Sequence, residues 1–187
     1  RRQRQMCIRD RPDGAAGDPA ADSTAVSRYE GLCGLRATGQ GYVQDNRPNG
    51  INRIVTRFYV FNELGAGQTA TVYEGFGDEA GGSSRFTVTM DDTGMFTLTD
   101  TVTGTSVNQA GDGGWDSVQL DWGADASAGF VSLSVNGAAV AETTGLSNAG
   151  TLESVRMGNL NGATGNMNFD AYLAQRSTAT TRVCNCN

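Results

Sequence analysis

Histidine and lysine are both missing from this 187-residue chain, and all 14 of its basic residues are arginine. Without histidine there is no Ser-His-Asp triad, no Cys-His pair and no imidazole ligand for zinc. Without lysine there is no Schiff-base chemistry and no P-loop lysine to hold a phosphate. The sequence therefore excludes several common catalytic classes, whatever the cause of the bias.

Long apolar runs are also missing. No window holds 18 consecutive apolar residues, and the N-terminus has no apolar stretch of the signal-peptide type. We therefore expect no membrane insertion, while export stays open because the sequence can start within a longer protein. Proline is limited to 3 residues, glycine reaches 26, and no helical periodicity is visible. This composition predicts one domain of short strands and turns.

The first 28 residues differ in composition from the rest. Residues 1–11, RRQRQMCIRDR, resemble translated sequencing-adapter sequence, and a nucleic-acid-binding arm is the alternative. Residues 12–25 are rich in Pro, Gly, Ala and Asp, which is typical of a linker. Without residues 1–11 the chain has 9 Arg against 19 Asp and Glu, a net charge of −10 that repels phosphate backbones. We expect residues 1–28 to be disordered or artefactual, and no nucleic-acid partner.

Apolar and polar residues alternate along most of the remaining chain. In RFTVTM (85–90), FTLT (96–99) and SVQLDW (117–122) every second residue is apolar, so each strand buries one face and Phe86, Phe96 and Trp122 belong to the core. The same pattern predicts strands at 30–37, 41–45, 52–62, 69–77, 84–90, 95–101, 116–123, 129–136, 138–143, 152–158 and 166–176. Such strands must pack face to face, which predicts an all-β, two-sheet antiparallel sandwich.

Three segments follow one another in a characteristic order. They are an extended entry, CGLRATGQGYVQDNRPNGINRIVTRFYVF, a Trp-led strand pair, WDSVQLDWGADASAGFVSLSVNGAAVAE, and a closing strand, GNMNFDAYLAQRS. Over residues 29–178 they resemble the laminin-G-like and concanavalin A-like jelly-roll domains of bacteria. The resemblance implies a secreted or cell-surface module of a longer parent protein, with residues 179–187 as a truncated tail. It implies binding of polysaccharide or glycoprotein glycan, or adhesion; a ligand-free spacer is an alternative.

Catalytic patterns of the resembling enzymes are absent or incomplete. Glycoside hydrolases of this fold place acids as Glu-x-Asp along one strand, and none of the six Glu here is followed two places on by Asp. Lyases of this fold use His, Tyr and Lys, of which only Tyr is present. We therefore predict that the domain is not an enzyme. A divergent hydrolase or lyase is the alternative, with Asp91 and Glu74 as one example of an acid pair.

Loops rich in oxygen atoms are candidates for a structural calcium. The segment QDNRPNG offers Asp45 and Asn46, whose carboxylate and amide oxygens are the ligand types that calcium accepts. In the resembling domains an Asp of the last strand holds calcium together with loops near the chain start, and Asp170 in NFDAY matches that position. The alternative is that these residues only form turns.

Aromatic residues are the candidates for glycan binding. A sugar ring packs on an exposed flat ring with a polar edge, and Trp115, Tyr59 and Tyr73 are the candidates once the core aromatics are set aside. The competing interpretation places all three in the core, as is common for aromatics in a sandwich.

Three cysteines lie outside residues 1–11, namely Cys33, Cys184 and Cys186. Because the chain ends of jelly rolls meet, the resemblance implies a disulfide from Cys33 to Cys184 or Cys186 in an oxidising compartment. A Cys-x-Cys metal half-site is the alternative.

Overall fold

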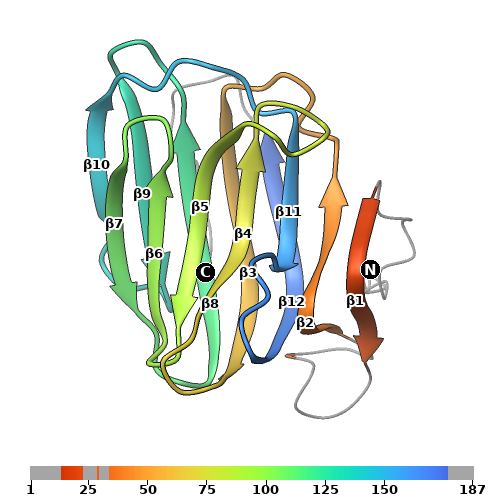
Figure 1. Ribbon diagram of the computed structural model, residues 1–187. Helices are drawn as coiled ribbons and strands as arrows, with labels where there is room; N and C mark the ends of the chain where they lie inside the picture. The colour runs from red at the N-terminus through yellow and green to blue at the C-terminus, as the bar shows by residue number, and fades with distance from the viewer. Residues whose placement is uncertain (1–13, 23–28, 30–33, 177–187) are drawn as a thin grey trace, which may run out of the picture.

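Figure 1 shows the computed structural model of the chain, which describes residues 14–22, 29 and 34–176. Its strands are β1 (Gly14–Asp22), β2 (Gly34–Asp45), β3 (Arg53–Leu64), β4 (Thr69–Phe76), β5 (Ser84–Asp91), β6 (Met95–Asp100), β7 (Thr105–Ala110), β8 (Trp115–Gly123), β9 (Gly129–Val135), β10 (Ala141–Leu146), β11 (Ser154–Asn159) and β12 (Gly165–Arg176). Over the described residues no helix is long and apolar enough to cross a membrane. The prediction of an all-β antiparallel fold is confirmed.

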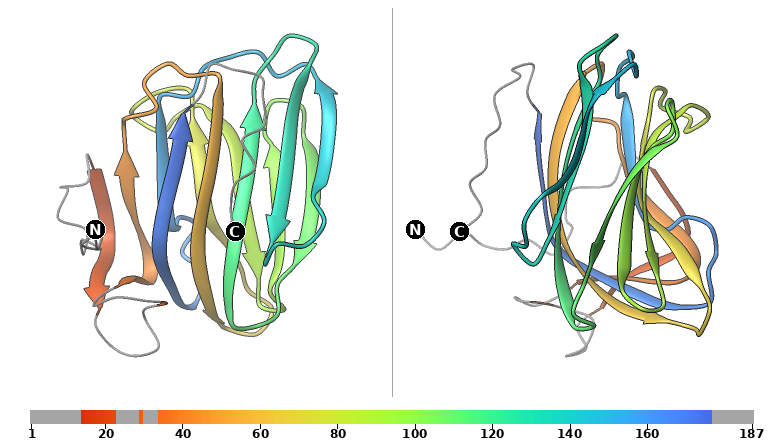
Figure 2. Two further views of the ribbon diagram at one scale, coloured as in Figure 1. Left: turned by 180° about the vertical axis from the view of Figure 1, so that it is seen from behind. Right: turned by 90° about the vertical axis from the view of Figure 1, so that its left-hand side faces the viewer.

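Backbone hydrogen bonds join the strands into one folded sheet. Its order is β10-β9-β8-β3-β12-β2-β11-β4-β5-β6-β7, with β1 paired to β2 off this path. The sheet folds over into two layers (Figure 2): a first layer of β10, β9, β8, β3 and β12, and a second layer of β11, β4, β5, β6 and β7. β2 joins the layers, because residues 35–38 pair with β12 and residues 41–45 pair with β11. The two layers of the predicted sandwich are thus halves of one continuous sheet.

Two strands were not predicted from the sequence, and one strand is continuous where the sequence predicted two. β1 lies inside the segment predicted to be a linker, and its pairing with β2 is a backbone contact that alternation of side chains does not reveal. β7 buries a single apolar side chain, that of Val107, so it lacks the alternating signal. β2 runs without a break through Gly39 and Gly41, where the sequence predicted two separate strands.

The core lies between the layers, on the faces that alternation predicted. The side chains of Phe86, Phe96 and Trp122 are fully buried, as are those of Phe58 and Phe169 on the first layer. Burial of such large apolar surfaces is the main stabilising term of the fold. The ring of Phe86 in the second layer packs on that of Trp122 in the first, with centroids 5.5 Å apart, so the aromatic core bridges the sandwich.

A buried carboxylate also crosses between the layers. Asp100, at the end of β6, accepts hydrogen bonds at Oδ2 from Trp122 Nε1 (3.0 Å) and Asn148 Nδ2 (2.6 Å). Its Oδ1 accepts from the backbone nitrogen and the hydroxyl of Thr103, both at 2.9 Å. Because one buried carboxyl group accepts all four bonds, this network holds β6, β8 and the β10–β11 connection together.

Candidate functional site

A bulge in β4 decides which of its side chains face outward. The register with β5 shifts between Thr71 and Tyr73, so Val72 and Tyr73 are consecutive residues that are both fully buried. The extra residue reverses the alternation from that point, and Glu74 therefore faces outward. Without the bulge, regular alternation after Val72 would point Tyr73 outward and Glu74 into the core.

Glu74 belongs to a line of polar residues across the outer face of the second layer, which we call the polar row. Its members are paired in register, strand by strand: Gln44 in β2, Arg156 in β11, Glu74 in β4, Thr87 in β5, Thr99 in β6 and Ser106 in β7. A parallel line of Thr71, Thr89, Thr97 and Asn108 runs beside it. Side chains opposite each other in a sheet are direct neighbours, so the polar row presents hydroxyls around one acid and one base.

The guanidinium of Arg156 is fixed by contacts on several sides. Its Cζ lies 4.5 Å from the ring centroid of Tyr42 and 4.7 Å from that of Phe76. Its Nε donates to Gln44 Oε1 at 2.8 Å, and its Nη2 donates to the carbonyl of Ala80 at 2.7 Å. A cation held between two rings loses little freedom when it binds an anion, so Arg156 is a prepared anion contact.

The carboxyl of Glu74 lies opposite Arg156 in register and is half-buried. Burial raises its pKa above the usual range, although the nearby Ser84 hydroxyl and the charge of Arg156 act in the other direction. A carboxyl with a raised pKa next to a fixed cation is a typical candidate for acid–base chemistry. Alternation alone did not identify this pair, since it joins residues about 80 positions apart in the chain.

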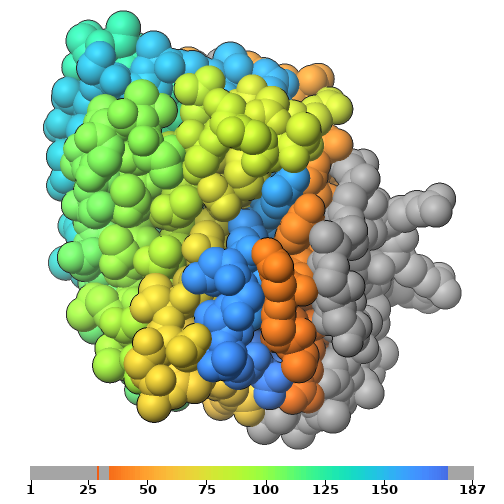
Figure 3. Space-filling model, in the orientation of Figure 1, coloured from red at the N-terminus to blue at the C-terminus, as the bar shows by residue number. Residues whose placement is uncertain are grey.

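Two loops flank the Glu74 end of the polar row, and Figure 3 shows this face from the front. The β4–β5 loop (77–83) bonds to β2 and β11 through its carbonyls. The β11–β12 loop (160–164) docks on β4 through Asn161, which donates to the Thr69 carbonyl (2.8 Å) and accepts from the Thr71 backbone nitrogen (3.0 Å). Glu74 therefore lies between two docked loops.

The predicted acid pair of Asp91 and Glu74 is not assembled. Asp91 lies four residues along β5 from Thr87, the partner of Glu74, which corresponds to roughly 13 Å at the rise of an extended strand. Hydrolases need their carboxyls within about 10 Å. Burial alone would raise the pKa of Asp91, but hydrogen bonds from Thr93 and Met95 lower it overall. Asp91 therefore caps its hairpin.

The predicted glycan-binding aromatics separate into two groups. Tyr59 and Trp115 lie together on the first layer, where the ring of Tyr29 stacks on Tyr59 (centroids 3.8 Å apart, 17° between planes) and meets Trp115 edge-on at 6.0 Å. Their role in binding stays a prediction. Tyr73 is 0% exposed and offers no ring face to a ligand, because the β4 bulge turns it inward.

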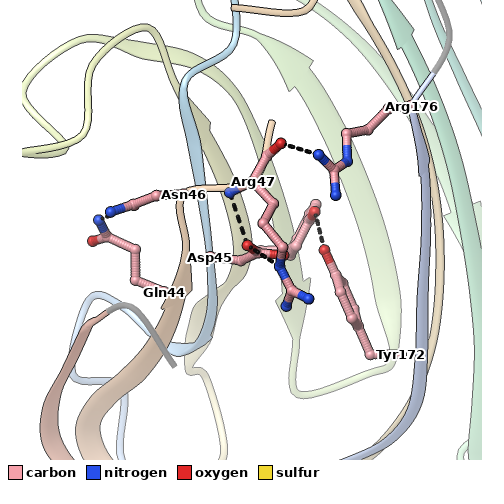
Figure 4. A network of polar contacts seen from close by, with 7 residues as sticks. Gln44, Asp45, Asn46, Arg47, Tyr172 and Arg176 are labelled. Carbon is pink, nitrogen blue, oxygen red and sulfur yellow. Dashed lines mark hydrogen bonds and ion pairs between the residues drawn. The ribbon is translucent and has the colours of Figure 1, made fainter. Parts of the chain in front are cut away.

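The predicted calcium ligands lie in separate networks. Asp45 Oδ1 accepts from the backbone nitrogen and Nε of Arg47 (2.9 and 2.7 Å), beside Tyr172 (Figure 4). Asn46 Oδ1 accepts from Gln44 Nε2 at 2.7 Å. Asp170 accepts from the backbone nitrogen of Tyr29 at 2.9 Å. Over the described ranges, no group of three or more His, Cys, Asp or Glu could hold a metal, and the calcium stays a prediction.

The predicted disulfide lies outside the described residues. Cys33, Cys184 and Cys186 all belong to segments that the structure does not describe, so the Cys33 pairing and the Cys-x-Cys alternative both stay open.

No family model matches the chain, and no curated protein matches it significantly. Membership of the laminin-G-like family therefore stays a prediction. Among solved structures the fold is similar to the cellulose-induced protein Cip1, with a TM-score of 0.63 and 14% identity over 96% of this chain and 91% of that one. It is also similar to tailspike protein 2 of an Escherichia coli O157:H7 bacteriophage, with a TM-score of 0.52 and 12% identity over 88% of this chain and 25% of that one.

An alginate lyase from Alteromonas sp. 272 shares the fold as well. The TM-score is 0.53, with 9% identity over 86% of this chain and 95% of that one. The prediction that the domain is not an enzyme is therefore wrong, since it treated the fold and the missing residue types as an exclusion. At these identities the likeness establishes a jelly-roll-like sandwich fold that also occurs in a polysaccharide-degrading enzyme.

Proposed function

We propose that this domain is secreted and acts on an acidic polysaccharide, with Glu74 and Arg156 as its reactive centre. The observation that carries the proposal is the pairing itself: a half-buried carboxyl with a raised pKa lies opposite a guanidinium that is already fixed in place. The fold shared with an alginate lyase and with a cellulose-induced protein supports a carbohydrate substrate.

The chemistry that fits one acid beside one cation is β-elimination from a uronic acid. Arg156 neutralises the carboxylate of the sugar and stabilises the negative charge that develops next to it. Glu74 removes the proton on the carbon that bears this carboxylate. The electron pair forms a carbon–carbon double bond, the glycosidic carbon–oxygen bond breaks, and the leaving oxygen takes the proton from Glu74. The products are an unsaturated sugar end and a new hydroxyl end.

Hydrolysis fits this site less well. It needs two carboxyls that flank the scissile bond, one as acid and one as base or nucleophile. The polar row contains one carboxyl, and the separation worked out above removes Asp91 as its partner. The hydroxyls of Thr87 and Thr99, next along the row, are neutral groups suited to hydrogen bonding with a sugar chain.

The test is turnover of alginate and polygalacturonate, followed by the ultraviolet absorbance of the unsaturated product, with cellulose as the neutral control. We expect Glu74→Gln to lower the rate at least 100-fold, the usual contribution of a general base. Arg156→Ala should lower both the rate and the affinity. The matched control is Glu142→Gln in β10 of the first layer, which should leave the rate unchanged.

Three outcomes separate the alternatives. Turnover of the acidic polymers that Glu74→Gln abolishes supports the proposal. Binding of those polymers without turnover removes Glu74 as a reactive group and leaves a binding domain. Neither binding nor turnover of either acidic polymer overturns the proposal.

A further inference from the structure

The β4–β5 loop covers the β2 and β11 end of the polar row. Its carbonyls accept three side-chain hydrogen bonds: Glu79 from Gln44 Nε2 (2.7 Å), Ala80 from Arg156 Nη2 (2.7 Å) and Asp78 from Ser154 Oγ (2.8 Å). These donors lie on two different strands, so the loop is attached across both. Figure 1 shows the loop crossing in front of the upper end of β11.

The loop backbone rests directly on the site cation. A Cβ added at Gly81 would lie 2.2 Å from Arg156 Nη2, so on this side the loop backbone packs directly against the guanidinium. Underneath, Phe76 and Ser154 are paired in register and are 3% and 0% exposed. The corner of the face beyond Arg156 is therefore filled by protein.

The loop is also fixed internally. Both carboxylate oxygens of Asp78 accept from the backbone nitrogen of Gly82, at 3.0 and 3.1 Å. This bond, with weaker ones from neighbouring loop amides, lowers the pKa of Asp78. A loop closed by such a carboxylate turn and by three external bonds has little freedom to move off the row.

The other end of the row is open. Thr99 and Ser106 on β6 and β7 bond to each other at 2.8 Å, and Ser106 is exposed. From Glu74 to Ser106 the row crosses three strand spacings, about 14 Å at 4.8 Å each. A sugar chain over Glu74 can therefore extend over β5, β6 and β7, while in the opposite direction it meets the loop.

We propose that the site accepts the reducing end of a polysaccharide chain, with the terminal sugar at Glu74 and Arg156 and the rest over the hydroxyls of β5 to β7. This inference rests on the proposed function, because it assumes that the Glu74 centre acts on a polysaccharide. It adds the mode of action: elimination releases the terminal sugar, and the internal glycosidic bonds of the polysaccharide do not reach the site.

The test compares two readouts of alginate degradation, the viscosity of the solution and the absorbance of the unsaturated product. We expect absorbance to rise while viscosity falls slowly, with small unsaturated sugars as the first products. Asp78→Ala and Ser154→Ala each remove a bond that holds the loop, so the viscosity lost per bond cleaved should rise several-fold. Asp125→Ala is the matched control, because Asp125 also caps an exposed turn, accepting from the Ser127 backbone nitrogen at 2.8 Å, but in the first layer.

Each failure is distinguishable. A rapid fall in viscosity at low conversion by the unmodified protein overturns the chain-end inference and leaves the proposed function intact. Loop variants that match the Asp125→Ala control also contradict it, since the loop would then not set the mode of action. Absence of both turnover and binding removes the proposed function, and this inference with it.

Discussion

Replacing Asp100 by Asn tests whether the buried carboxylate between the layers holds the fold together. The change keeps the shape of the side chain but turns one acceptor oxygen into an amide nitrogen, which donates. If the amide nitrogen faces Trp122 Nε1 and Asn148 Nδ2, both of these donors lose their acceptor. If it faces Thr103, the Thr103 hydroxyl can reverse and accept from it, but the Thr103 backbone nitrogen, which can only donate, loses its acceptor.

The expected cost follows from counting these bonds. At least one of the four is lost without replacement, and a hydrogen bond to a charged group contributes about 1.5–3 kcal/mol. Asp100→Asn should therefore lower the free energy of unfolding by about 1.5–3 kcal/mol. That is a large share of the 5–15 kcal/mol typical of a domain, so the variant should remain folded but melt well below the unmodified protein. Thr103→Ala removes the hydroxyl bond to Asp100 and a long, exposed bond from the Thr105 backbone nitrogen (3.4 Å), and it should cost about 1 kcal/mol.

Urea unfolding followed by tryptophan fluorescence measures both variants, because Trp122 is part of the network. The m-value should stay constant if the folded states are equally compact. A loss below about 1 kcal/mol for Asp100→Asn, at an unchanged m-value, would show that these bonds are worth far less than the range for charged acceptors. Equal losses for the two variants would contradict the same reasoning.

Three further predictions concern pH, charge and metal. Burial raises the pKa of Tyr172 to about 12. The free energy of unfolding should therefore fall by about 3 kcal/mol as the pH rises from 10 towards 12, at 1.36 kcal/mol per pH unit. Urea unfolding of Tyr172→Phe should show a smaller fall over this pH range, and an equal fall would contradict the prediction. Because burial raises the pKa of Glu74, the ionised side chain destabilises the fold at pH 7. Glu74→Gln should therefore raise the Tm. A lower Tm would mean that the attraction between Glu74 and Arg156 dominates. The calcium prediction for Asp170 and Asp45 expects the Tm to fall when a chelator replaces calcium, and an unchanged Tm contradicts it.

Regular strands were predictable from the sequence because their alternation is local. Phe86 and Trp122 were assigned to the core from their neighbours in the chain alone, and both are fully buried. The Asn136-Gly137 turn is also encoded locally, since both residues adopt the positive φ values (53° and 71°) that these residue types tolerate. Such features need no information from distant strands.

The candidate site was not predictable for two physical reasons. The bulge in β4 reverses the alternation at Val72, where no Gly or Pro marks it, so Tyr73 was a candidate for a surface that it does not reach. The pairing of Glu74 with Arg156 depends on the register of β11 against β4. A register between strands far apart in the chain is set by the whole fold, and no local pattern reports it.

Because β2 crosses from one layer to the other, hydrogen-bonded strands join the two layers of the sandwich along one edge. At β2 the layers can separate only by breaking backbone hydrogen bonds to β11 or β12. On the opposite side, β7 lies next to β9 and β10 without pairing with them, and Gln109 Nε2 donates to the carbonyl of Ala139, in the connection between β9 and β10, at 2.8 Å. We therefore expect opening motions to start at β7 and β10, with the earliest amide hydrogen exchange there and the latest near β2, close to Arg156 and Glu74. The part of the polar row that contains Glu74 and Arg156 should therefore be the part that opens least often.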